Sequence, residues 1–265
     1  MANWVTNRIF IRGNPEKIKE VVGNQYSPFS FNKILPRPKE LNIDGDTNEQ
    51  LFIFMTNKCT KPISEVSKQK RNLLLSSDKQ YFTKPLREIL QQVKDYPPSR
   101  LEKEYILGGR KYQNIIKFGF PDWGSWCDAN WGTKWESHEA ELFFESDKEL
   151  GYMFQSAFVF PKPIIQYLSD VLKTKITCLY TDEDLGLSCG FLQFNKGKHT
   201  KEWYPKNEIL RVLFSAEIEG MGEYIIEDME EWEDFEEEEA KRLEMIAANL
   251  EKYFPKEVYE YMKKK

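Results

Sequence analysis

The chain opens with residues that alternate between apolar and polar side chains, which is the pattern of a strand with one buried face. Val5, Ile9 and Ile11 fall on one side, and Trp4, Thr6, Arg8, Phe10 and Arg12 fall on the other. A short helix is expected next: Asn14 suits its cap, Pro15 its first position and Gly23 a left-handed end. The first predicted unit is therefore a strand followed by a helix.

Four later segments repeat the period of two and are predicted as strands: 139–144, 153–160, 175–180 and 187–194. Between the second and third, Pro161 and Pro163 precede apolar positions at helical spacing, which predicts a helix over 164–172. The order matches a ferredoxin-like split β-α-β with one strand added. We predict an α+β protein with an antiparallel sheet and helices on one face.

Two further segments are predicted to be helical. From about 51 to 107 the apolar positions take helical spacing, which indicates an insertion within a domain over 1–220. The pair Gly108-Gly109 is predicted to form a turn after this insertion. Residues 221–265 form an acidic C-terminal segment, with a helix expected over 229–254.

Composition excludes several classes of protein. With 265 residues, of which 40% are hydrophobic, the chain can bury an ordinary core. It lacks an apolar run long enough for a membrane span and lacks an export signal, so we expect a cytoplasmic protein. Its 4 cysteines and 2 histidines have no metal-ligand spacing, so neither a metal nor a cofactor is expected.

Charge is unevenly distributed along the chain. Residues 1–110 hold 19 Lys and Arg against 12 Asp and Glu, whereas residues 221–265 hold 7 against 15. Basic residues of the insertion could bind nucleic-acid phosphates, although they also suit the solvated side of helices. Those named for this role are Lys58, Lys61, Lys68, Lys70 and Arg71.

The acidic segment suggests a different kind of partner. Eleven of the seventeen residues from Glu223 to Glu239 are Asp or Glu. Such a surface can imitate a nucleic-acid backbone and occupy the basic groove of a host protein, although acids also favour a helix start. The predicted partner surface comprises Glu230, Glu231, Glu233, Asp234, Glu237 and Glu238.

A tryptophan-rich stretch is the candidate binding site. Indole rings beside amide and ammonium groups suit bases, sugars or a loop of a partner protein, but the same residues could pack a short helix against the sheet. The candidates are Trp123, Trp126, Asn130, Trp131, Lys134 and Trp135. Catalysis is not expected: His138, Glu139 and Glu141 could transfer a proton, but no phosphate loop or nucleophile elbow accompanies them.

Three segments together resemble the YubB ferredoxin-like domain family. They are Asn3 to Arg8, Phe31 to Pro38 and, most specifically, Trp126 to Trp135. The resemblance implies the same ferredoxin-like fold and an origin on a phage, plasmid or other mobile element. It implies no catalytic residue, because most members have no known function.

Two functional hypotheses follow. The first is a non-enzymatic binding protein of a phage or mobile element that inhibits a host defence or nucleic-acid-processing protein. The alternative is a DNA- or RNA-binding accessory protein that uses the basic insertion and an open sheet face, because aromatic side chains on such a face can stack on bases.

Overall fold

A computed structural model describes residues 3–44, 47–56, 84–184, 187–220 and 245–264. The chain forms two compact units. A sheet unit comprises Met1–Pro36 and Ala129–Lys265, and a helical unit comprises Arg37–Asp128. The acidic residues 230–238 and the basic residues 58–71 named above lie outside the described residues, so their predicted roles stay predictions.

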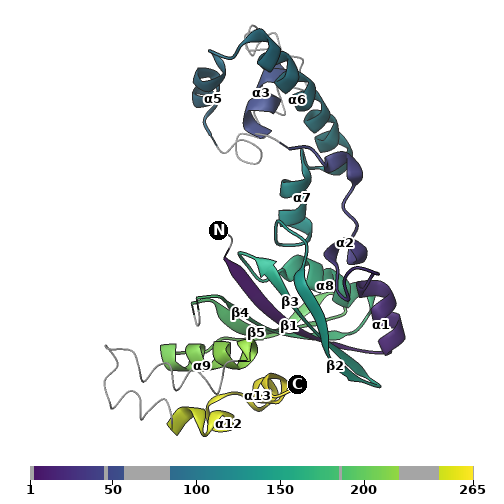
Figure 1. The fold of residues 1–265 in the computed structure, drawn as a ribbon, viewed down its shortest axis with the longest axis vertical. Coiled ribbons are helices and arrows are strands. Elements are labelled where there is room, and N and C mark those ends of the chain that lie inside the picture. The colour runs from purple at the N-terminus through teal and green to yellow at the C-terminus, as the bar shows by residue number, and fades with distance from the viewer. Residues whose placement is uncertain (1–2, 45–46, 57–83, 185–186, 221–244, 265) are drawn as a thin grey trace. The chain divides into compact units, whose positions relative to one another are not determined.

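The described residues of the sheet unit form an antiparallel sheet of six strands in the order β2-β3-β1-β4-β5-β6. Its first four strands in that order, with α1 (Pro15–Val22) and α8 (Lys162–Val171), have the ferredoxin-like arrangement, which confirms the predicted fold (Figure 1). The strands are β1 (Trp4–Arg12), β2 (His138–Ser146), β3 (Glu149–Ala157), β4 (Lys175–Asp182), β5 (Cys189–Asn195) and β6 (Lys198–Trp203). The sequence did not predict β6, because this exposed edge strand has almost no apolar residues.

The first face of the sheet, which bears Val5, Ile9 and Ile11 of β1, holds a core of aromatic and aliphatic side chains. Phe29, in the loop before α2 (Phe31–Ile34), stacks on Phe154 of β3 with ring centroids 4.7 Å apart. The α1 helix begins as predicted, since the side chain of Asn14 accepts from the Lys17 N–H at 3.1 Å. Its predicted left-handed end is wrong: Gly23 is extended, with φ −98°.

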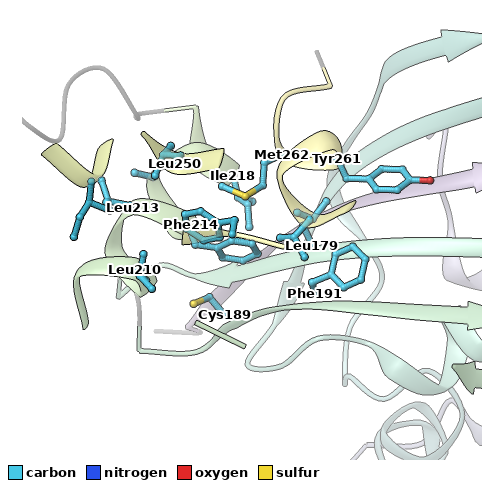
Figure 2. Packing of buried hydrophobic residues seen from close by; sticks show 14 of the residues in the cluster. Leu179, Cys189, Phe191, Leu210, Leu213, Phe214, Ile218, Leu250, Tyr261 and Met262 are labelled. Atoms are coloured by element: carbon cyan, nitrogen blue, oxygen red, sulfur yellow. The ribbon is translucent and has the colours of Figure 1, made fainter. Parts of the chain in front are cut away.

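The second face, which bears Trp4 and Phe10 of β1, is also covered by helices, whereas the sequence predicted helices on one face only. This layer comprises α9 (Glu208–Glu219), α12 (Leu250–Tyr253) and α13 (Lys256–Met262). Leu179 of β4 and Phe191 of β5 pack against helix residues that include Phe214 and Met262 (Figure 2). The expected open sheet face is therefore covered over this part of β1, β4 and β5.

Arg8 of β1 joins the ends of two of these helices. Its guanidinium donates to the backbone oxygens of Glu217 at 3.5 Å and Met262 at 3.4 Å, and also to that of Lys264. Carbonyl groups at helix C-termini attract cations, so one buried side chain holds both α9 and α13 against the sheet. Burial lowers the pKa of Arg8.

A carboxylate of α13 anchors this helix farther across the second face. The Glu257 carboxylate accepts from Lys175 Nζ at 2.7 Å and Lys201 Nζ at 2.8 Å. Burial alone would raise the pKa of Glu257, but the hydrogen bonds from these lysines and from Gln193 outweigh it and lower the pKa to about 2. The contact between α13 and the sheet is therefore both apolar and ionic.

The helical unit is wider than the predicted insertion over 51–107, because it begins at Arg37 and ends at Asp128. It includes η1 (Lys39–Leu41), α3 (Thr47–Thr56), α5 (Leu86–Val93), α6 (Pro98–Phe118) and most of α7 (Trp123–Asn130). The turn predicted at Gly108-Gly109 is wrong, since both residues lie inside α6. A Cβ atom at Gly108 would lie 1.9 Å from the Gln50 oxygen, so glycine permits α6 to approach α3 closely.

Candidate binding site

The tryptophan-rich stretch does not form one exposed surface. Its residues Trp123 and Trp126 belong to the helical unit, whereas Trp131 and Trp135 belong to the sheet unit. Trp126 and Trp131 are buried, so the prediction that they line a binding surface is wrong. Asn130 is half-buried, Lys134 and Trp135 are exposed, and Trp135 has 39% of its surface accessible.

Structural contacts account for two of these tryptophans. The Trp131 indole N–H donates to the Leu35 oxygen at 3.0 Å, and its ring lies 5.9 Å from that of Phe31. The Trp123 indole N–H donates to the Asp44 carboxylate at 3.0 Å within the helical unit. An indole whose N–H is hydrogen-bonded within the protein holds a loop or helix in place, which agrees with the alternative prediction that these residues serve packing.

Trp135 instead belongs to a group of aromatic rings at one end of the sheet. We call Trp4, Trp135, His138 and Phe158 the aromatic corner. The Trp4 ring centroid lies 6.0 Å from that of Trp135 and 5.1 Å from that of His138, and Trp135 lies 5.9 Å from Phe158. Each spacing falls within the range for favourable aromatic pairs, so the rings support one another.

Strand pairing brings the corner together from distant parts of the chain. In the sheet, Trp4 of β1 is opposite Ala157 at the end of β3, which directly precedes Phe158. His138 begins β2 and pairs with Gln155 of β3. Residues more than a hundred positions apart in the sequence therefore meet at the same sheet end (Figure 1).

Phe158 has an unusual backbone conformation, with φ +69°. The sequence predicted a strand that continued to Phe160, but β3 ends at Ala157 because Phe158 enters the left-handed region. Its N–H donates to the Asn3 oxygen at 2.7 Å. The turn leaves Phe158 with 51% and Val159 with 50% of their surfaces exposed.

Buried polar side chains hold this turn in place. The Ser156 hydroxyl donates to the Val159 oxygen at 2.8 Å and accepts from the amide nitrogen of Asn7 at 2.9 Å. The Thr133 hydroxyl donates to the Ala157 oxygen at 2.8 Å. A bulky residue at positive φ persists only where its surroundings over-determine it, and such residues gather at functional sites.

One carboxylate lies against a ring of the corner, and two further acidic residues contact β1 beside it. The Glu139 carboxylate lies 3.8 Å from His138 Nδ1, and its side chain is 67% exposed. The Glu183 N–H donates to the Trp4 oxygen at 3.0 Å. Thr6, on the same side of β1 as Trp4, lies beside Glu219 of α9, and burial raises the pKa of Glu219.

His138 and the nearby Glu136 make structural contacts. His138 stacks on Trp4 at an interplanar angle of 25°, which makes it part of the aromatic corner. The Glu136 carboxylate accepts from the Asn32 N–H at 3.0 Å and the Ser30 hydroxyl at 3.1 Å, so it caps the start of α2. Within the described ranges no group of three His, Cys, Asp or Glu residues could hold a metal ion.

Sequence reasoning found one member of the corner as a site residue, Trp135. It missed Trp4, His138 and Phe158 as partners of that residue, because strand register is what brings them together. A usable signal was the aromatic run from Phe158 to Phe160, placed just before a predicted helix at Pro161.

The sheet unit defines a ferredoxin-like α+β protein. Residues 130–245 match the family model described as the ferredoxin-like domain in Api92-like protein. This match does not confirm the predicted relationship to the YubB family in particular. None of the helices in the described parts of the chain is long and apolar enough to span a membrane.

The comparison with solved structures finds a protein api92 from Yersinia pseudotuberculosis. That crystal structure shares 11% sequence identity with this chain, covers 78% of this chain and 99% of its own, and has a TM-score of 0.36. No curated protein matches the chain.

Proposed function

We propose that this chain is a non-enzymatic binding protein that engages a partner protein through the aromatic corner. The observation that carries the proposal is the exposure of Trp135 and Phe158 within one contacting group of rings. Large aromatic side chains are enriched among the residues that dominate protein–protein binding. A turn held at positive φ presents Phe158 at a reduced entropic cost on binding, because its backbone is already ordered.

Two observations favour a protein over a nucleic acid as the partner. The Glu139 carboxylate lies 3.8 Å from His138 of the corner, and negative charge repels phosphate groups. The sheet positions that would stack on bases in an open face are covered, since Phe10 and Phe191 are fully buried beneath the second helical layer. The alternative of nucleic-acid binding therefore depends on the Lys and Arg residues between 58 and 71.

The resemblance to the YubB family supports a wider proposal, that the chain comes from a phage or mobile element and its partner is a host protein. Inhibition of a host defence or nucleic-acid-processing protein is the role we propose for this contact. The acidic residues 230–238 would add electrostatic attraction to a basic groove of the same partner.

Capture of partners from a host lysate tests the proposal. Three full-length proteins are compared: the natural chain, Trp135→Ala/Phe158→Ala, and the control Tyr26→Ala, which removes an aromatic ring that is 88% exposed elsewhere in the sheet unit. We expect a partner to be retained by the natural chain and the control and lost by the double variant. Equal retention by all three proteins would overturn the role of the corner.

A further inference from the structure

We infer that the partner segment bound at the aromatic corner carries an arginine side chain, which lies against the indole rings and pairs with the neighbouring carboxylates. This inference rests on the proposed function and adds the chemistry of the partner. It follows from three features of the corner: its charge, the environment of one half-buried carboxylate, and the orientation of its rings.

The exposed groups beside the corner are mainly acidic. Glu139 follows His138 directly, and Glu183 is tied to the Trp4 backbone at 3.0 Å. Glu141 of β2 pairs with Met153, which places it on the second face with Trp4. Lys134 and Lys162 are the exposed basic residues nearest to the corner in the chain, but the carboxylate placed against one of its rings is that of Glu139, 3.8 Å from His138 Nδ1. A cationic partner is therefore attracted and an anionic one repelled.

Glu219 adds a carboxylate from the helical layer on the same face of the sheet. It is half-buried at the end of α9, and the Thr6 side chain lies beside it. Among the described residues it has no ion-pair partner, in contrast to Glu217, which lies 2.8 Å from Lys263 Nζ. A partly desolvated carboxylate gains more from a cation than an exposed one does.

The rings offer faces to a flat cation. Trp135 is inclined by 45° to both Trp4 and Phe158, so neither ring stacks on a face of Trp135, whereas one face of Trp4 is stacked on His138. The negative face of an aromatic ring attracts a cation, and guanidinium does so while its N–H groups still donate to carboxylates. Arginine therefore fits this combination of groups better than lysine, whose ammonium is a compact point charge.

Fluorescence anisotropy with short labelled peptides tests this inference on the full-length chain. The probes are hexapeptides in which glycine alternates with arginine, lysine, serine or glutamate. We expect the arginine peptide to bind most tightly, the lysine peptide less tightly, and the other two not at all. The variants Trp135→Ala and Glu139→Gln/Glu219→Gln should each weaken arginine-peptide binding by about three- to fivefold.

A charge-matched control separates the corner from the general acidity of the chain. Glu20→Gln/Glu251→Gln removes the same two charges at exposed positions on α1 and α12. This control should leave binding of the arginine peptide within about 1.5-fold of the natural chain, because the corner is intact. An equal loss in the control and the corner variants would overturn the inference, and so would binding that is unaffected by Trp135→Ala.

The failure of this inference can be told apart from the failure of the proposed function. If Trp135→Ala/Phe158→Ala loses the captured host partner but Glu139→Gln/Glu219→Gln retains it in full, the corner binds a protein, but the inference that the partner contributes an arginine is overturned. If the serine peptide binds as tightly as the arginine peptide, the contact is apolar and the inference is again overturned. Loss of the partner in both double variants would support both statements.

Discussion

Two aromatic residues on the same side of β1, Trp4 and Phe10, have different surroundings. Phe10 is fully buried, with its ring centroid 5.0 Å from that of Tyr261 in α13. Trp4 is half-buried and contacts Trp135 and His138 at the edge of the helical layer. The alternation of the strand assigns both rings to one face. Helices that come about 200 residues later in the chain bury Phe10 in the core and leave part of Trp4 accessible.

The covered half and the open corner also differ in how they use polar groups. Under the helices, Arg8 and Glu257 each bind several partners and thereby fasten the layer to the sheet. At the corner, polar side chains such as Ser156 hold a turn that exposes apolar surface. The first arrangement stabilises the fold, whereas the second prepares a surface for a partner.

The largest expected effect compares the two rings directly. Phe10→Ala should lower the free energy of unfolding of the sheet unit by about 3–5 kcal/mol, because it opens a cavity in a closed core. Trp4→Ala should cost about 1 kcal/mol, because its ring is partly solvated. Hydrogen exchange of the β1 and β4 amides measures both values. Similar losses in the two variants would contradict the distinction between covered half and open corner.

A second experiment concerns the arginines of β1. Arg8→Met keeps most of the aliphatic volume but leaves the helix-end carbonyls of Glu217 and Met262 without their donor, so we expect a loss of about 2–3 kcal/mol. Arg12→Met is the matched control: its side chain is 61% exposed, and the expected change is under about 0.5 kcal/mol. Urea unfolding followed by the same amides would show whether Arg8 holds the helical layer.

The ionic contact of α13 should give the covered half a dependence on pH. The pKa of Glu257 in the folded chain is about 2, below its ordinary value of 4.5. Its stabilising contribution is therefore complete above pH 4.5 and is lost as pH falls towards 2.

Glu257→Gln should lower stability by about 1 kcal/mol at pH 7 and flatten the acid limb of the stability curve in this window. Glu260→Gln, on the exposed side of α13, should leave the curve unchanged. Thermal unfolding at intervals from pH 7 to 2 measures the difference, and parallel curves for all three proteins would argue against an anchoring role.

The smallest expected change in stability lies at the corner. Phe158→Gly should change the free energy of unfolding by less than about 0.5 kcal/mol, because relief of the steric cost at φ +69° offsets the lost contact with Trp135 and the greater freedom of glycine in the unfolded chain. The same variant should lose the host partner, because the exposed ring is gone. Val159→Gly, which replaces an exposed neighbour that is not at positive φ, should destabilise slightly. A Phe158→Gly protein that is both less stable than the Val159→Gly protein and fully active in capture would refute the interpretation of this turn.

The local pattern predicted several elements well. Alternation located β1 to β5 to within a few residues, and Asn14 and Pro15 placed the start of α1. It failed where a residue serves a distant contact. Gly108 has the character of a turn residue, yet it lies within α6 because α3 approaches there. Trp126 and Trp131 look like binding residues in a list of side chains, but packing buries both.

By itself, the sequence determined the order of β1 to β5 and of the helices α1 and α8 between them, and the side of each strand on which a residue lies, because these depend on steric preferences and periodicity over a few neighbouring residues. Only the tertiary structure decided which side chains remain accessible. Register between β1, β2 and β3 assembled the aromatic corner, and the docking of α9 and α13 closed the rest of the same face. Exposure is a property of contacts between distant segments, and a local pattern does not contain it.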